Sequence, residues 1–184
     1  MSKIFIIFII FNFYSPVYSS ITKNIITQMK LTNNLSFNFI QTIDDKNENG
    51  KCIIKYPKKI WCEYNNSNKK IIVSNGKSLV IKNRNSGNYY IYPLNKTPLI
   101  FLLDKEYLIS KINILKPREI DEKYLNFTIF ENNNEINIFF NKEDLSLAGW
   151  QTEDIYQNLS ITFISSIKIN QKIDDKIFIL PKKN

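Results

Sequence analysis

Side chains that could do chemistry are few in this chain of 184 residues, and those present do not form a catalytic set. Histidine is absent, which excludes a Ser-His-Asp triad, a Cys-His pair and any histidine-ligated zinc site. Adjacent carboxylates, such as Asp44 with Asp45, lie in polar segments typical of turns. Neighbouring residues on a strand point to opposite faces, so such a pair cannot flank one glycosidic bond. The sequence therefore predicts a protein that is not an enzyme and needs no cofactor or metal ion.

Two short segments imitate ligand-binding loops. Gly76-Lys77-Ser78 matches the end of a phosphate-binding loop, but Ile71 stands where the first glycine of that motif would be. The segment 45–50 matches the first half of a calcium-binding loop, but Tyr56 occupies the position of the closing glutamate. We therefore interpret both segments as turns between strands.

Cys52 and Cys62 are the only cysteines, and they flank a turn centred near Pro57. A hairpin with this turn places the two thiols opposite each other on one face of neighbouring strands. An oxidising compartment favours a disulfide between them. Because disulfide geometry is demanding in a flat ladder, two free apolar thiols are equally compatible with the pattern. The sequence leaves both states open.

The chain is basic, with 25 Lys plus Arg against 17 Asp plus Glu and a net charge of +8. Ile, Asn and Lys crowd the sequence, a skew typical of an A+T-rich genome, so the charge is weak evidence about partners. The lysines are spread over turns and strand ends and never form a block of five. This pattern favours a solvated surface over nucleic-acid binding.

The N-terminus resembles an export signal. Lys3 precedes an apolar run, and Val17 and Ser19 stand at the −3 and −1 positions of a cleavage site before Ser20. We predict a signal peptide over residues 1–19 and one domain over residues 20–184. The alternative is an uncleaved anchor helix, although the apolar run is short for a membrane span.

The rest of the chain predicts a mostly β fold with short helices. A helix is expected over residues 21–31, a polar turn over 44–50, and a hairpin turn at Asn75-Gly76. The expected strands are 37–43, 52–56, 60–64, 71–74, 78–82, 89–92, 124–130, 135–140, 146–151, 159–165 and 177–179. Short strands at hairpin spacing favour a curved sheet or partial barrel.

Alternation along these strands predicts an inward-facing apolar set. Lys51, Lys55, Trp61 and Glu63 fall on the opposite, outer face. The residues expected to line the interior are Cys52, Ile54, Tyr56, Ile60, Cys62, Tyr64, Ile72, Leu79, Ile81 and Tyr90. They line either a cavity or an ordinary packed core.

One helical segment interrupts the strands. Thr97 is expected to cap it and Pro98 to occupy its first position, and a further helical turn is expected over 107–111. The segment is apolar nearly all round, through Leu99, Ile100, Phe101, Leu102 and Leu103. A helix of this kind either covers an apolar mouth as a movable lid or plugs the end of the barrel as core.

The order and spacing of several motifs resemble the LolA family of periplasmic carriers of outer-membrane lipoproteins. The resemblance covers nearly the whole chain after the N-terminal segment. The matching segments are Phe39-Ile40-Gln41-Thr42, Gly50, Tyr56-Pro57, Trp61-Cys62-Glu63-Tyr64, residues 73–79, Thr97-Pro98-Leu99 with Leu102-Leu103, residues 147–152, Asp154, Asn158 and residues 178–181.

This resemblance implies an unclosed antiparallel β-barrel, a half-barrel, covered by a helical lid formed by Leu99, Phe101, Leu102 and Leu103. It also implies an apolar cavity for the acyl chains of lipoproteins. The expected partners are acylated lipoproteins, an inner-membrane lipoprotein-releasing ABC transporter and an outer-membrane acceptor. We expect a monomer in the periplasm.

One position departs from the family pattern. Tyr56 stands where family members usually carry an arginine that lines the cavity and bonds to the lid. A phenol donates one neutral hydrogen bond, whereas a guanidinium offers five charge-assisted donors. The alternative function is therefore a LolA-like lipid-binding, sensor or interaction module without a role in lipoprotein relay.

Overall fold

The computed structural model describes residues 17–66, 68–131, 134–153 and 158–183. Most of the predicted signal peptide, and Asp154 of the family motifs, lie outside these residues. The helices are α1 (Val17–Leu31), η1 (Leu94–Lys96), α2 (Leu99–Leu103), α3 (Lys105–Ile114) and η2 (Asp175–Phe178). The strands are β1 (Asn34–Ile43), β2 (Lys46–Lys55), β3 (Lys59–Tyr64), β4 (Lys70–Asn75), β5 (Ser78–Asn83), β6 (Tyr89–Pro93), β7 (Arg118–Ile120), β8 (Tyr124–Glu131), β9 (Asn134–Asn141), β10 (Leu147–Glu153) and β11 (Leu159–Ile169).

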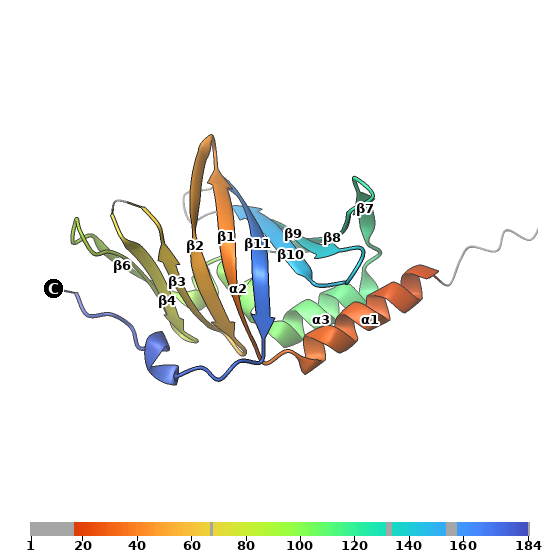
Figure 1. The fold of residues 1–184 in the computed structure, drawn as a ribbon, viewed down its shortest axis with the longest axis horizontal. Coiled ribbons are helices and arrows are strands. Elements are labelled where there is room, and N and C mark those ends of the chain that lie inside the picture. Colours follow the sequence, from red (N-terminus) through yellow and green to blue (C-terminus); the bar gives the residue numbers. More distant parts are fainter. Residues whose placement is uncertain (1–16, 67, 132–133, 154–157, 184) are drawn as a thin grey trace, which may run out of the picture.

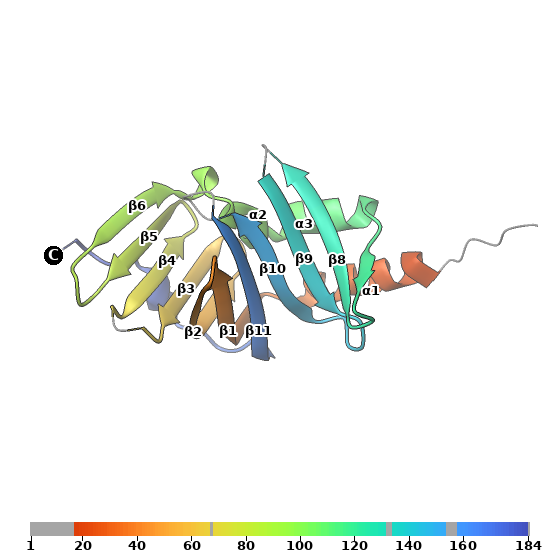
Figure 2. The ribbon, with the colours of Figure 1, turned by 90° about the horizontal axis from the view of Figure 1, so that it is seen from above.

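All these strands form one antiparallel sheet in the order β6-β5-β4-β3-β2-β1-β11-β10-β9-β8-β7. The N-terminal and C-terminal halves of the sheet meet where β1 pairs with β11. The two edge strands, β6 and β7, do not pair with each other, so the sheet curves without closing (Figures 1 and 2). The prediction of a mostly β fold with short helices, an unclosed antiparallel half-barrel, is confirmed.

One hydrophobic core lies between the helices and one face of the sheet. Ile25 of α1, Leu103 of α2 and Ile112 of α3 are fully buried there, as are Ile54 of β2 and Ile138 of β9. Helices α1 and α3 lie side by side beneath the half of the sheet that contains β8 to β11 (Figure 1). Helix α2 connects this helical layer to β6. None of the described helices combines the length and the apolarity that a membrane span requires.

The β2–β3 hairpin has the register predicted from its turn. Cys52 lies opposite Cys62, and Ile54 lies opposite Ile60. The next turn, at Asn75-Gly76, is also confirmed. Gly76 has a positive φ of 96°, and the Asn75 carboxamide accepts hydrogen bonds from the two backbone N–H groups that follow the glycine.

One predicted turn in the strand region is wrong. The polar segment 44–50 is not one long turn, because β2 begins at Lys46 and Ile43 pairs with Lys46 across a tight connection. Asp44 supplies the positive φ of 50° that this connection needs. Strands β1 and β2 therefore extend through the predicted turn, as far as Ile43 and Lys46. The short edge strand β7 was not predicted.

The C-terminal segment 177–179 is not a strand. It lies at the end of η2, which Asp174 caps by accepting from the Lys176 backbone N–H. Phe178 is buried against the outer face of β3 and β4, and Asp175 binds Lys55 at 2.8 Å. Phe178 therefore covers the outside of the sheet, where Figure 1 shows η2 beside β3 and β4, and the segment adds no strand.

The helix boundaries also differ from the predictions. Helix α1 begins at Val17, one turn before the predicted start, and α3 is longer than the predicted 107–111. Thr97 does not cap α2; its hydroxyl donates to the Leu94 carbonyl at 2.8 Å, and Pro98 occupies the N-cap position. The threonine therefore ends η1, and α2 starts without a side-chain cap.

Candidate functional site

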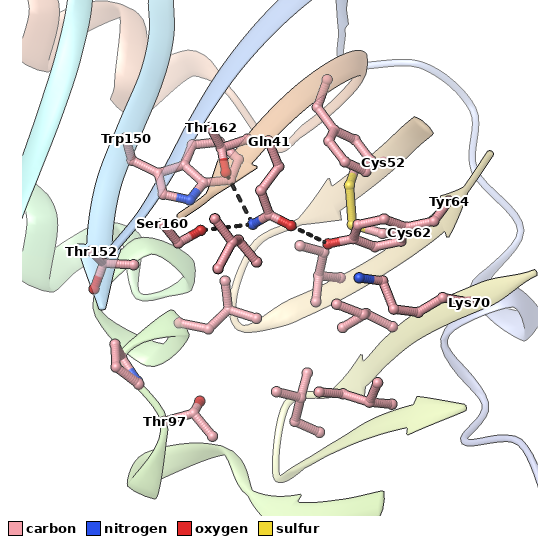
Figure 3. Close-up of a pocket in the computed structure, with 18 of the residues that line it drawn as sticks. Gln41, Cys52, Cys62, Tyr64, Lys70, Thr97, Trp150, Thr152, Ser160 and Thr162 are labelled. Carbon is pink, nitrogen blue, oxygen red and sulfur yellow. Dashed lines mark hydrogen bonds between the residues drawn. A yellow bond between two sulfur atoms is a disulfide. The ribbon is translucent and has the colours of Figure 1, made fainter. Parts of the chain in front are cut away.

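A cavity of about 420 Å³ opens on the helical face of the sheet, between the N-terminal half-sheet and the start of α2 (Figure 3). Aliphatic side chains of β3, β4 and β5 form one wall. Strands β1, β10 and β11 form the opposite wall, which carries polar groups. The lining consists of Phe39, Gln41, Ile43, Cys52, Ile60, Cys62, Tyr64, Lys70, Ile72, Leu79, Ile81, Asn83, Tyr90, Thr97, Pro98, Leu99, Trp150, Thr152, Glu153, Ser160 and Thr162.

Most of the residues predicted to face inward meet at this cavity. Those that line it are Cys52, Ile60, Cys62, Tyr64, Ile72, Leu79, Ile81 and Tyr90. Ile54 points to the same side of the sheet but is fully buried in the core. Tyr56 lines a second cavity, of about 230 Å³, between α1, α3 and strands β9 to β11. The structure therefore divides the predicted set between a cavity, the packed core and a separate pocket.

The two cysteines form a disulfide across β2 and β3, with a Cα–Cα distance of 4.1 Å. Both are almost fully buried, and both line the cavity. Of the two states that the sequence left open, the structure has the disulfide. The bond ties two adjacent strands of the cavity wall together and presents sulfur, an apolar surface, to the interior.

Helix α2 touches the cavity only through its first residue, Leu99. Leu102 and Leu103 point into the core, where they are 3% and 0% exposed. Phe101 packs against the Tyr107 ring of α3 at a centroid distance of 5.3 Å. Of the four residues predicted to form a lid, Leu99 therefore contacts the cavity directly, and the others attach the helix to its surroundings.

The junction between α2 and α3 is fixed to the β2–β3 turn. The Lys58 backbone N–H donates to the Leu103 carbonyl at 3.0 Å, and the Lys58 ammonium binds Asp104 at 3.0 Å. Asp104 also caps α3 by accepting from the Tyr107 backbone N–H. A hinge motion of α2 that moves this junction must therefore break these contacts.

Tyr56 is not bonded to α2, although it replaces the arginine expected to reach the lid. Its ring is half-buried in the second cavity, and the Lys105 ammonium lies 5.6 Å from the ring centroid. Burial raises the pKa of the Tyr56 phenol above its ordinary value, so the group is neutral. Lys105 of α3 supplies the positive charge near this position, which the arginine before the turn proline supplies in the family pattern.

The polar wall of the cavity holds a hydrogen-bond network that the sequence analysis missed. The Gln41 amide nitrogen donates to Ser160 Oγ at 2.9 Å and to Thr162 Oγ1 at 3.2 Å. Tyr64 Oη donates to the Gln41 amide oxygen at 2.9 Å. Figure 3 shows Gln41 between the two hydroxyl side chains and the phenol. The alternation of polar residues at 160 and 162 was the available signal, but such positions are ordinarily assigned to a solvent face.

Lys70 closes one side of this polar wall. Its ammonium forms an ion pair with Glu48 and lies 3.8 Å from the centroid of the Tyr64 ring. Burial and the nearby Glu48 carboxylate raise the pKa of Tyr64, which keeps the phenol protonated as a donor. The lysine charge is compensated by the glutamate, so it does not turn the cavity into a strong anion site.

The groups around the cavity are mostly apolar or neutral. In the part of the chain that the structure describes, no group of three or more acidic or cysteine side chains is placed to hold a metal ion. The cysteines are oxidised, and the network contains no group that titrates near neutral pH. What remains is an apolar interior with one hydrogen-bonding wall, which matches an amphipathic ligand.

Comparison with known families identifies this architecture. The sequence model of the family described as "Outer membrane lipoprotein carrier protein LolA" matches residues 30–180. The chain therefore belongs to the LolA family. No curated protein sequence matches it significantly.

Solved structures are similar to it in outline. A LolA superfamily protein from Nitrosomonas europaea is 11% identical, with 89% of this chain and 97% of the other covered and a TM-score of 0.48. A DUF1329 family protein from Desulfovibrio piger is 7% identical, with 88% and 96% covered and a TM-score of 0.43.

Proposed function

We propose that this protein is a periplasmic carrier that holds the acyl chains of lipoproteins in the 420 Å³ cavity. It receives them as they leave the inner membrane and delivers them to the outer membrane. In this proposal a lipoprotein-releasing ABC transporter supplies the cargo, and an outer-membrane acceptor takes it. The signal peptide predicted over residues 1–19 would direct the chain to the periplasm.

The observation that carries the proposal is the lining of the cavity. Ile60, Ile72, Leu79 and Ile81 form a continuous aliphatic wall, and the disulfide extends it. An alkyl chain has no hydrogen-bonding groups to satisfy, and each CH₂ moved from water to such a wall gains about 0.8 kcal/mol. Membership of a family described by lipoprotein transport makes the acyl chains of lipoproteins the occupant that fits best.

A second candidate function is lipid binding or sensing without delivery. It is favoured by Tyr56, which lies in a separate pocket and does not bond to α2. The family arginine would have linked the cavity lining to the lid, so this chain has lost one means of coupling cargo to lid position. A lipid sensor would bind acyl chains equally well but would not pass lipoproteins to an acceptor.

The experiment that tests the carrier function is uptake of lipoproteins from inner-membrane vesicles. Ile81→Trp fills the cavity from the β5 wall and should abolish uptake while the protein stays folded. The matched control is Ile91→Trp, since Ile91 lies on neighbouring β6 but is 55% exposed on the outer face. Normal uptake by the Ile81→Trp variant would contradict the proposal. Uptake without transfer to acceptor-containing membranes would support the sensor instead.

A further inference from the structure

The Gln41 network has more hydrogen-bond donors than it can use internally. Two amide hydrogens and the hydroxyl hydrogens of Tyr64, Ser160 and Thr162 make five donors. Three bonds link these four side chains. Two donor hydrogens therefore remain without an acceptor in the network.

This result does not depend on how the amide is oriented. With the amide nitrogen toward Ser160 and Thr162, the spare hydrogens are those of the two hydroxyls. If the amide is rotated by half a turn, both hydroxyls donate to its oxygen, and the spare hydrogens belong to the amide and to Tyr64. Either way, two donors in the polar wall are available to an acceptor inside the cavity.

These donors are buried, so leaving them unused is costly. Ser160, Thr162 and Tyr64 are 4%, 2% and 6% exposed, and all three line the cavity. A buried donor without a partner is unfavourable, so an occupant that supplies acceptor oxygens is preferred over one that is purely apolar. The polar wall therefore favours a ligand that carries acceptor oxygens at one position along an otherwise apolar chain.

The charges of the cavity select against an anion. Lys70 and Glu153 are the charged residues among its described lining, and Lys70 is paired with Glu48. Among these described lining residues, no uncompensated cation is available for a carboxylate or a phosphate. A neutral oxygen acceptor, such as a carbonyl, fits the two donors without burying an unpaired charge.

On the basis of the function proposed above, we propose that the Gln41 network recognises the ester carbonyl of a neutral, ester-linked acyl lipid. The acyl chain lies along the aliphatic wall of β3, β4 and β5. The carbonyl oxygen accepts the two spare hydrogens at the β1–β11 wall. This wall therefore distinguishes ester-linked acyl groups from ether-linked alkyl chains and from free fatty acids.

The test compares dimyristoylglycerol with its dialkyl ether analogue, which has the same chain length but no carbonyl. Both lipids displace a fluorescent apolar dye from the purified protein. The unmodified protein should bind the ester about tenfold more tightly, which corresponds to about 1.4 kcal/mol. The quadruple variant Gln41→Leu, Tyr64→Phe, Ser160→Ala and Thr162→Val removes all five donors, whichever way the amide is oriented, and should bind the two lipids equally.

The matched control is Thr42→Val with Ser165→Ala, which removes two hydroxyls from the outer face of β1 and β11 and should preserve the tenfold preference. If the quadruple variant does not fold, the triple variant that retains Tyr64 is used; it keeps one donor, and the expected preference is about threefold. Equal binding of ester and ether by the unmodified protein would overturn this inference but leave the carrier function intact. Tighter binding of myristate than of the ester would also overturn it. Failure to bind dye and lipids altogether would overturn both proposals.

Discussion

Replacing Leu103 with alanine tests how firmly helix α2 is held. Leu103 is fully buried, and the change removes three carbons from the core. At about 0.8 kcal/mol per carbon, the lost transfer free energy is roughly 2.4 kcal/mol. The cavity left behind raises the expected loss to about 2.7–5 kcal/mol, because the Leu103 carbonyl is bonded to Lys58 and the helix cannot easily settle inward.

Leu99→Ala is the matched control on the same helix. Leu99 is half-buried and lines the cavity, so its removal should cost less than about 1 kcal/mol of stability. The same change should weaken lipid binding, because it removes apolar surface that the ligand contacts. Leu103→Ala is expected to lower stability without entering the cavity.

Urea unfolding followed by far-UV circular dichroism measures both effects. The midpoint should fall for Leu103→Ala at an unchanged slope, which indicates a loss of stability without a change in the denatured state. If Leu103→Ala is as stable as the unmodified protein, α2 is not packed in the core in solution. The description of α2 as an anchored helix would then be wrong, and the whole helix would behave as a movable lid.

Three further predictions follow from individual contacts. Alkylation without reductant should leave Cys52 and Cys62 unmodified in mass spectra, and reduction should lower stability by about 2–3 kcal/mol, as expected for a closed loop with a sequence separation of 10. Gly50→Ala should cost about 1–3 kcal/mol in thermal unfolding, because a Cβ there would lie 2.1 Å from a backbone oxygen of β3. The hydrogen bond from Lys111 holds the pKa of Glu131 below its usual value, so this stabilisation is complete above about pH 4.3 and is lost as the pH falls through the lower, folded-state pKa. In melts across this range, Glu131→Gln should be less pH-dependent than the unmodified protein.

Local rules in the sequence predict much of the sheet. The turn at Pro57 sets the register of β2 and β3, and period-two alternation then determines which side chains face the helices. For this reason Cys52 and Cys62 could be placed opposite each other, although their redox state could not. The segment 44–50 was mispredicted because Asp, Asn and Glu are typical of turns, whereas cross-strand pairing with β1 overrides that preference here.

The candidate site was only half predictable. Its aliphatic wall comes from consecutive hairpins, so alternation was enough to find Ile72, Leu79 and Ile81. Its polar wall depends on β1 pairing with β11, a contact between segments more than a hundred residues apart. No local pattern shows that Gln41 and Ser160 meet, or that a polar position on β11 faces inward.

Tyr56 shows a similar limit. Its alternation with Cys52 and Ile54 correctly places it on the inner side of the sheet. The side chain nevertheless lines a separate pocket, because α1 and α3 pack against that end of the hairpin. Which of two pockets a residue lines is decided by the helices above the sheet, and the pattern of the strand does not contain that information.

The most direct test of the carrier function is to identify what the cavity holds after purification. The chain is expressed with its N-terminal segment, isolated from the periplasm without detergent and extracted with organic solvent, and the extract is analysed by mass spectrometry. We predict acylated material in the extract of the unmodified protein and of Ile91→Trp, and its loss from Ile81→Trp. Extracts without acylated material from all three proteins, together with no binding of added lipoprotein, would contradict the account.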